Sequence, residues 1–119
     1  MLKEEFGFSI FRHAADSATN MFSHVVIFFT DPAIADAPDK LIAGATKYLK
    51  AVPGLTFFHV GKMVPSHRPV VDQSYQVALN VAFQSKQAQD DYQVHPLHLE
   101  FVEKVFKPLC RKVVVYDFE

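Results

Sequence analysis

The residues best suited to chemistry lie close together in the segment Tyr92-Gln-Val-His95-Pro-Leu-His98. Imidazole and phenol groups exchange protons or hydrogen bonds near neutral pH. His98 falls on the apolar stripe of a helix predicted over residues 97–110, where burial should lower its pKa and keep it neutral. A neutral imidazole can act as a general base, and Tyr92 can hydrogen-bond to it or to a ligand. For His98 alone, the spacing favours a simpler interpretation, a packed core histidine.

A second histidine, His24, begins the apolar segment His24-Val-Val-Ile-Phe-Phe29. Its β-branched and aromatic residues predict a strand. If helices cover the face that His24 shares with Val26 and Phe28, His24 and His98 converge at one end of the core. Two histidines and a tyrosine at the mouth of an apolar cavity indicate a site more strongly than one histidine does. The alternative is that His24 only ends the strand, with its polar edge in water.

Other chemistry has little support in the sequence. His95 and His98 have the i,i+3 spacing of a metal pair, but Pro96 lies between them and no nearby carboxylate or thiolate completes a ligand set. The four glycines do not form G-x-G-x-x-G, and neither G-x-S-x-G nor a P-loop occurs. The single cysteine, Cys110, cannot form an internal disulfide and is interpreted as a small core residue. We therefore expect no metal and no cofactor.

The order of elements that must position these residues is β-α-β-β-α-β. It predicts an α+β protein with a ferredoxin-like protomer and a four-stranded antiparallel sheet. Asp36 is the expected cap of the first helix and Ser85 the expected cap of a short polar helix that precedes the one carrying His98. The predicted strands cover residues 24–29, 55–61, 75–84 and 112–118, and the first helix ends at Pro53-Gly54.

Helices in this topology cover only one face of the sheet, yet the first strand is apolar on both. The other face carries Val25, Ile27 and Phe29, together with Phe57 or Phe58 and alternate valines of residues 113–115. A bare apolar patch of this size is unusual for a monomer, so we expect a homodimer that packs sheet on sheet into a barrel-like core. The alternative cover is residues 1–20, but so short an extension would have to cover a whole sheet.

Length and composition limit the remaining possibilities. The chain has 119 residues, enough for one domain, and 12 basic against 13 acidic residues give a net charge of −1. This balance argues against nucleic acid or an anionic membrane as the main partner. No apolar stretch reaches the roughly 18 residues that span a bilayer. Because of Glu4 and Glu5, the N-terminal segment over residues 1–20 is a poor secretory signal. We therefore expect a cytoplasmic protein.

The segment Tyr92-x-x-His95-Pro96-x-His98 followed by Phe101-Val102 is the most specific of several motifs in the chain. Further motifs are the opening His24-Val-Val-Ile-Phe, Val52-Pro53-Gly54-Leu55, Val60-Gly61, the strand over residues 75–83, Lys107-Pro108-Leu109 and Val115-Tyr-Asp117-Phe118. From Met21 onward these motifs resemble the stress-responsive A/B barrel (Dabb) family. The resemblance implies a Dabb domain over residues 21–119 and protomers that dimerise through their sheets. Residues 1–20 keep no regular pattern and are interpreted as an N-terminal extension.

The resemblance also implies roles for individual residues. One plant member, olivetolic acid cyclase, performs an aldol-type cyclisation of a polyketide without a cofactor. Its catalytic histidine and tyrosine correspond to His98 and Tyr92, and a further pocket histidine corresponds to His24. Ala45 stands where that pocket has another tyrosine, so the same substrate is not implied. The expected function is binding of a small apolar or ketide-like molecule, with cofactor-free cyclase- or isomerase-like chemistry.

In this interpretation the apolar part of the pocket is lined by Val26, Phe28, Leu79 and Phe101. The alternative function is a non-catalytic, stress-associated structural or interaction protein, with a closed core around His98. A third and weaker alternative, oxygen-dependent monooxygenation of an aromatic compound, has no motif that favours it.

Overall fold

The structure is a computed structural model that describes residues 21–119, so the predicted extension over residues 1–20 lies outside it. The predicted α+β, ferredoxin-like order of elements is confirmed. The elements are β1 (Phe22–Thr30), α2 (Ala37–Gly44), η1 (Ala45–Leu49), β2 (Leu55–Lys62), β3 (Val77–Phe83), α3 (Lys86–Val94), α4 (Pro96–Phe101), η2 (Val102–Phe106), α5 (Lys107–Leu109) and β4 (Cys110–Phe118).

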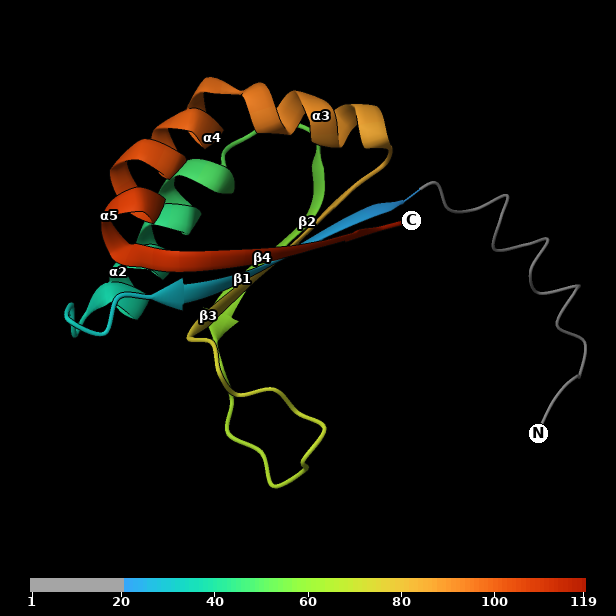
Figure 1. The fold of residues 1–119 in the computed structure, drawn as a ribbon. Coiled ribbons are helices and arrows are strands. Elements are labelled where there is room, and N and C mark those ends of the chain that lie inside the picture. Colours follow the sequence, from blue (N-terminus) through green and yellow to red (C-terminus); the bar gives the residue numbers. More distant parts are fainter. Residues whose placement is uncertain (1–20) are drawn as a thin grey trace, which may run out of the picture.

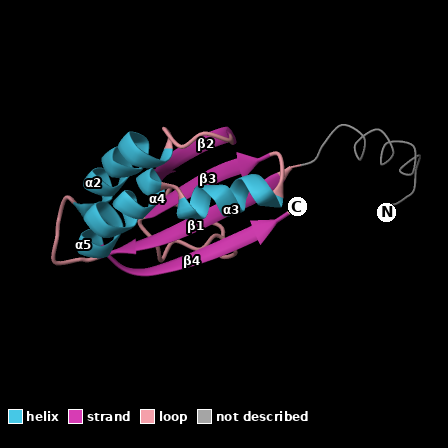
Figure 2. Cartoon of the chain, turned by 90° about the horizontal axis from the view of Figure 1, so that it is seen from above, coloured by secondary structure: helices cyan, strands magenta, loops and turns pink. Residues whose placement is uncertain are grey.

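The four strands form an antiparallel sheet in the order β2-β3-β1-β4, with β1 hydrogen-bonded to β3 on one side and to β4 on the other. All helices lie on one face of this sheet (Figure 1). Figure 2 shows them from above, with α2, α4 and α5 over one end of the sheet and α3 over the other. The loop between β2 and β3 extends on the opposite side (Figure 1). The structure is therefore a two-layer protomer with one covered and one open sheet face.

The covered face carries the core, and strict alternation along the strands produces it. In β1 the side chains at even positions from Phe22 to Thr30 are buried, whereas those at odd positions are partly exposed. In β3 the predicted alternation is confirmed except at Ala82, which is buried although it lies on the other face. The core side chains of this face include Phe22, Val26, Phe28, Val77, Leu79, Val81 and Phe83, and those of the helices include Leu41, Leu49, Tyr92, Phe101 and Val105.

The predicted helix caps have different outcomes. Ser85 caps α3 as expected, because its hydroxyl oxygen accepts a hydrogen bond from the Ala88 N–H at 3.1 Å. Asp36 occupies the cap position of α2, but its side chain makes no capping bond and lies instead 3.4 Å from the Lys40 ammonium. The start of α2 therefore depends on its backbone and on Pro38 in the first turn.

The helix predicted as continuous over residues 97–110 contains a wider π-helical turn, η2. In this turn the Lys107 N–H donates to the carbonyl of Val102, five residues earlier, instead of four. The turn directly precedes Pro108, which has no N–H to donate and whose ring would crowd the preceding turn of a regular α-helix. The regular helix predicted from periodicity is thus corrected, although the predicted stripe residues Phe101 and Val105 stay buried in the core.

The open face carries the apolar side chains that the sequence left without cover. Register places Val25, Ile27, Phe57, Val114, Tyr116 and Phe118 on this face. Phe57 is 50% exposed, and Tyr116 and Phe118 are each 59% exposed. Of the two phenylalanines considered, Phe58 packs against the core. Among residues 21–119, no helix covers this face, and the β2–β3 loop approaches it only beside Ile27 and Phe29.

Candidate functional site

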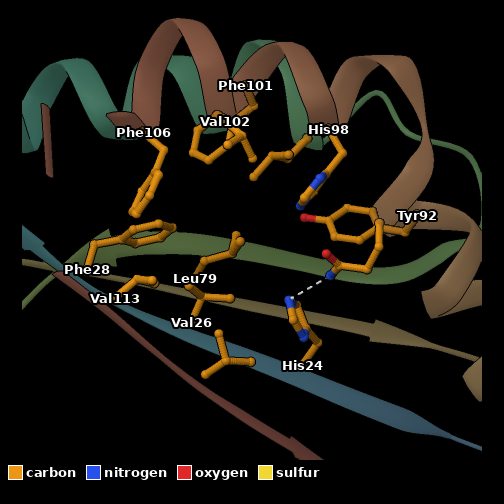
Figure 3. A pocket seen from close by; sticks show the side chains of 13 residues that line it. His24, Val26, Phe28, Leu79, Tyr92, His98, Phe101, Val102, Phe106 and Val113 are labelled. Atoms are coloured by element: carbon orange, nitrogen blue, oxygen red, sulfur yellow. Dashed lines mark hydrogen bonds between the residues drawn. The ribbon is translucent and has the colours of Figure 1, made fainter. Parts of the chain in front are cut away.

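A pocket of about 160 Å³ lies between the covered face and the helices (Figure 3). The three predicted catalytic residues, His24, Tyr92 and His98, line one end of it, and the four predicted ligand-contacting residues line its walls. We call this cavity the histidine pocket. It is lined by His24, Val26, Phe28, Leu49, Leu79, Tyr92, Gln93, His98, Phe101, Val102, Phe106, Val113 and Val115.

Three different elements bring the polar rings of the histidine pocket together. His24 comes from β1, Tyr92 from α3 and His98 from α4. The centres of the Tyr92 and His98 rings are 4.8 Å apart, and those of the His24 and Tyr92 rings are 6.0 Å apart. The helices cover the sheet face that carries His24. The predicted convergence of His24 and His98 at one end of the core is therefore present in the fold.

The junction between α3 and α4 sets the position of His98. His95 has an extended backbone, and its Nδ1 accepts a hydrogen bond from the Leu97 N–H at 3.1 Å, which caps α4. Pro96 occupies the first position of α4, where no N–H is needed. The ring of His95 therefore caps the start of α4.

Among residues 21–119, no three histidine, cysteine or acidic side chains are grouped to hold a metal ion.

Tyr92 contributes a hydroxyl without a hydrogen-bond partner in the described part of the chain. Its side chain is 1% exposed, and its Oη is buried. Burial raises the pKa of Tyr92 well above its usual value of 10.0, because the phenolate would lose its solvation. Tyr92 therefore stays a neutral hydroxyl, which can donate a hydrogen bond to a ligand but is a poor base.

His98 is the second group with a buried atom that lacks a partner, its Nδ1. Burial lowers the pKa of His98 below 6.5, and the nearby His24 ring lowers it further, whereas the backbone of Gln93 acts in the opposite direction. The direction is the one expected from its position on the apolar stripe. His98 therefore presents a neutral imidazole to the pocket at neutral pH.

His24 is paired, which the sequence did not indicate. It lies two residues inside β1, is 5% exposed, and its Nδ1 is 2.5 Å from Oδ1 of Asp117 on β4. Its Nε2 lies 3.5 Å from the side-chain nitrogen of Gln93 (Figure 3). The alternative that His24 merely ends the strand with its edge in water is therefore wrong. Asp117 and Gln93 are the polar neighbours that sequence reasoning missed.

The pocket residues that the sequence did not predict come mainly from the π-helical turns η1 and η2 and from β4. Val102 and Phe106 belong to η2, and Leu49 belongs to η1. Val113 and Val115 lie on the covered face of β4 yet are 38% and 46% exposed, so the pocket opens to solvent beside this edge strand. The only available signal was alternation in the run of valines, which does not by itself say which valines face the helices.

Cys110 does not contribute a reactive group to this pocket. Its side chain is partly buried against the core, and burial raises the pKa of the thiol to about 11. A thiol with a raised pKa is a poor nucleophile at neutral pH.

Within residues 21–119, no helix combines the length and apolar character needed to cross a membrane.

The antiparallel sheet with helices on one face defines the chain as a ferredoxin-like α+β protein. The family model for the stress responsive A/B barrel domain (Dabb) matches residues 22–119. The chain belongs to this family, as its sequence motifs suggested.

Relatives and solved structures agree with this assignment. The stress-response A/B barrel domain-containing protein HS1 of Arabidopsis thaliana is 29% identical over 105 residues, which are 87% of this chain and 94% of the relative. A dimeric ferredoxin-like protein of unknown function from Jannaschia sp. CCS1 has a TM-score of 0.65 and 25% identity, covering 83% and 98% of the two chains. A hydroxynitrile lyase from Passiflora edulis has a TM-score of 0.70 and 20% identity, covering 83% and 92%, a likeness of fold.

Proposed function

We propose that the histidine pocket binds a small, largely apolar or ketide-like molecule that carries a carbonyl or hydroxyl group. One observation carries this proposal: the Tyr92 hydroxyl and the His98 Nδ1 are buried in an apolar pocket without hydrogen-bond partners. A buried polar atom left unpaired costs about 1–3 kcal/mol. A ligand oxygen that reaches either atom would remove this cost, whereas a purely apolar ligand would not.

The size of the pocket suits one ring or a short chain. A protein cavity of about 150 Å³ is large enough to bind benzene, and the histidine pocket has about 160 Å³. Its walls are apolar apart from the rings at one end and Gln93. A longer ligand would extend past Val113 and Val115, where the pocket opens.

The chemistry we propose is proton abstraction next to a carbonyl without a cofactor, as in a lyase or cyclase. His98 serves as a general base or as a hydrogen-bond donor, Tyr92 is its partner and stabilises the developing enolate oxygen, and His24 orients the ligand. The non-catalytic alternative, a stress-associated structural or interaction protein, requires a closed core around His98. A pocket of ligand size next to His98 favours the ligand-binding proposal.

The test compares the wild type with His98→Ala, using monocyclic aromatic ketones as probes and NMR chemical shifts to measure binding. We expect wild-type binding and a loss of roughly tenfold or more in the variant, since a hydrogen bond to a buried group is removed. His67→Ala, in the exposed β2–β3 loop, is the matched control. Unchanged binding by His98→Ala, with only its stability altered, would leave His98 as a core residue.

We further propose that a second copy of the chain covers the open face and closes the two sheets into a barrel-like core. The half-exposed Phe57, Tyr116 and Phe118 support this proposal, because a contiguous apolar surface of this kind marks an interface. The Jannaschia protein of the same fold is dimeric. Sedimentation velocity on the full chain tests it, and a monomer at micromolar concentration would contradict it.

A further inference from the structure

We infer that Asp117 is a positioning residue of the histidine pocket, and that His24, held by Asp117, takes up the proton that a bound substrate releases. The inference rests on the proposed function and deepens it, because it assigns the proton acceptor to the paired histidine. His98 then acts as a neutral hydrogen-bonding group. The observation behind it is the contact between the two ends of the described chain, His24 on β1 and Asp117 on β4.

The contact fixes which nitrogen of His24 carries hydrogen. An ionised carboxylate can only accept hydrogen bonds, so the Nδ1 that lies 2.5 Å from Asp117 must be the N–H. In a neutral imidazole the other nitrogen, Nε2, is then an acceptor. Figure 3 shows a nitrogen of His24 directed into the pocket along the dashed line, which marks the contact of Nε2 with Gln93. Asp117 thus orients a ring whose Nε2 electron pair faces the pocket, where it accepts a long hydrogen bond of 3.5 Å from the Gln93 amide that a ligand must displace.

The surroundings of the two histidines differ in the way that matters for holding a proton. A proton taken up by His24 creates a cation next to the carboxylate of Asp117, so the net charge of the pair changes from −1 to zero. A proton taken up by His98 creates a cation in a largely apolar environment, where the neutral backbone of Gln93 favours the charged form but no carboxylate does, and its Nδ1 has no partner among residues 21–119. Moving charge into the pocket therefore costs less free energy at His24 than at His98.

The step balances without an oxidant or a cofactor. The C–H bond next to the substrate carbonyl breaks, the proton moves to Nε2 of His24, and the electron pair forms an enolate. The enolate oxygen accepts a hydrogen bond from the hydroxyl of Tyr92. The centres of the Tyr92 and His24 rings are 6.0 Å apart. Nε2 later returns the proton to the product, and the His24–Asp117 pair is restored.

The first measurement needs no ligand. In the ¹⁵N-labelled full chain, imidazole nitrogen shifts report the tautomer of each histidine, and His24→Gln assigns the His24 signals. We expect the Nδ1–H tautomer of His24 in the wild type, its replacement by mostly Nε2–H in Asp117→Ala, and its return in Asp117→Glu. Asp91→Ala, which removes an exposed carboxylate on α3, is the matched control and should leave the tautomer unchanged. An unchanged tautomer in Asp117→Ala would overturn the role of Asp117.

The second measurement uses 4-nitrophenol, a one-ring acid whose ionised form absorbs visible light. We expect the wild type to bind it as the phenolate, with the proton on His24. In Asp117→Ala the ratio of bound phenolate to bound phenol should fall roughly tenfold or more, since the opposite charge is lost. In His24→Gln the phenolate form should disappear, whereas His98→Gln should bind more weakly yet keep it.

The two measurements separate the two proposals. Phenolate that persists in His24→Gln but disappears in His98→Gln would assign the proton acceptor to His98 and overturn the inference. Absence of binding to every form of the protein would count against the proposed function and, with it, the proton-acceptor role. The tautomer measured without ligand would still decide whether Asp117 positions His24.

Discussion

The two faces of the sheet are built from the same strands and differ mainly in what covers them. On the covered face, alternate residues of β1 pack under the helices and enclose a pocket with three polar rings. On the open face, the intervening residues of β1 join Phe57, Tyr116 and Phe118 in an apolar surface without cover in the described chain. A strand with two apolar faces can therefore supply a binding cavity and an association surface at once.

Histidine behaves differently on the two faces for the same reason. His24 is buried on the covered face and paired with Asp117. His59 lies on the open face opposite Asn80 and is exposed. In a single protomer the exposed ring of His59 exchanges water partners freely, whereas a buried ring must be satisfied by fixed groups or by a ligand. The covered face is therefore where fixed histidine chemistry can develop.

The largest expected effect is on the covered face. Phe83→Ala removes a fully buried ring that packs against Tyr92, with ring centres 5.1 Å apart. We expect a loss of about 3–5 kcal/mol in the free energy of unfolding, measured by urea denaturation. Phe57→Ala, the same change on the open face, should cost less, and its cost should depend on protein concentration. Equal losses at every concentration would contradict the distinction between the faces.

The open face is tested by placing a charge on it. Phe57→Lys should weaken the proposed association by about 2 kcal/mol, because a desolvated aromatic contact is replaced by a charge. This corresponds to a roughly thirtyfold higher Kd for the dimer in sedimentation equilibrium. Val94→Lys, an equally apolar exposed position on α3, is the control and should leave the Kd unchanged. Equal effects of the two changes would show that the open face is not the interface.

A smaller effect of opposite sign is expected for the unpaired hydroxyl on the covered face. Tyr92→Phe should raise the free energy of unfolding by about 1 kcal/mol, because it removes a buried group without a partner. The same change should weaken binding of a ketone probe. Tyr48→Phe, at a partly buried position on η1, is the control for thermal denaturation. A loss of stability in Tyr92→Phe would mean that the hydroxyl is already satisfied in the free protein.

The smallest effect concerns pH. Because burial lowers the pKa of His98 in the folded state below 6.5, the unfolded chain binds more protons below about that pH. The contribution of His98 is therefore complete above pH 6.5 and declines as the pH falls below it. We expect the free energy of unfolding of His98→Gln to fall less steeply than that of the wild type between pH 6.5 and about 5. Curves for wild type and His98→Gln that run parallel over this range would contradict the assignment.

The sequence predicted most of the fold because its signals are local. Alternation over β3, the cap at Ser85 and the stripe that carries Phe101 and Val105 each depend on neighbours a few residues away. The π-helical turn η2 was missed because simple periodicity assumes regular hydrogen bonds, although Pro108 supplied a local reason to doubt them. The cap made by His95 was also missed, since a histidine before Pro96 gave a weaker signal than a serine.

Residue types and their spacing alone determined that this chain forms one α+β protomer and that one sheet face needs a cover. They also determined that Tyr92 and His98 lie on consecutive helices, close to each other. Only the tertiary structure decided that His24 meets Asp117, because this contact joins residues 93 positions apart through the register of β1 and β4. It also decided which valines of β4 face the helices. A one-residue shift in register would move every side chain of β4 to the other face, and local sequence cannot specify that choice.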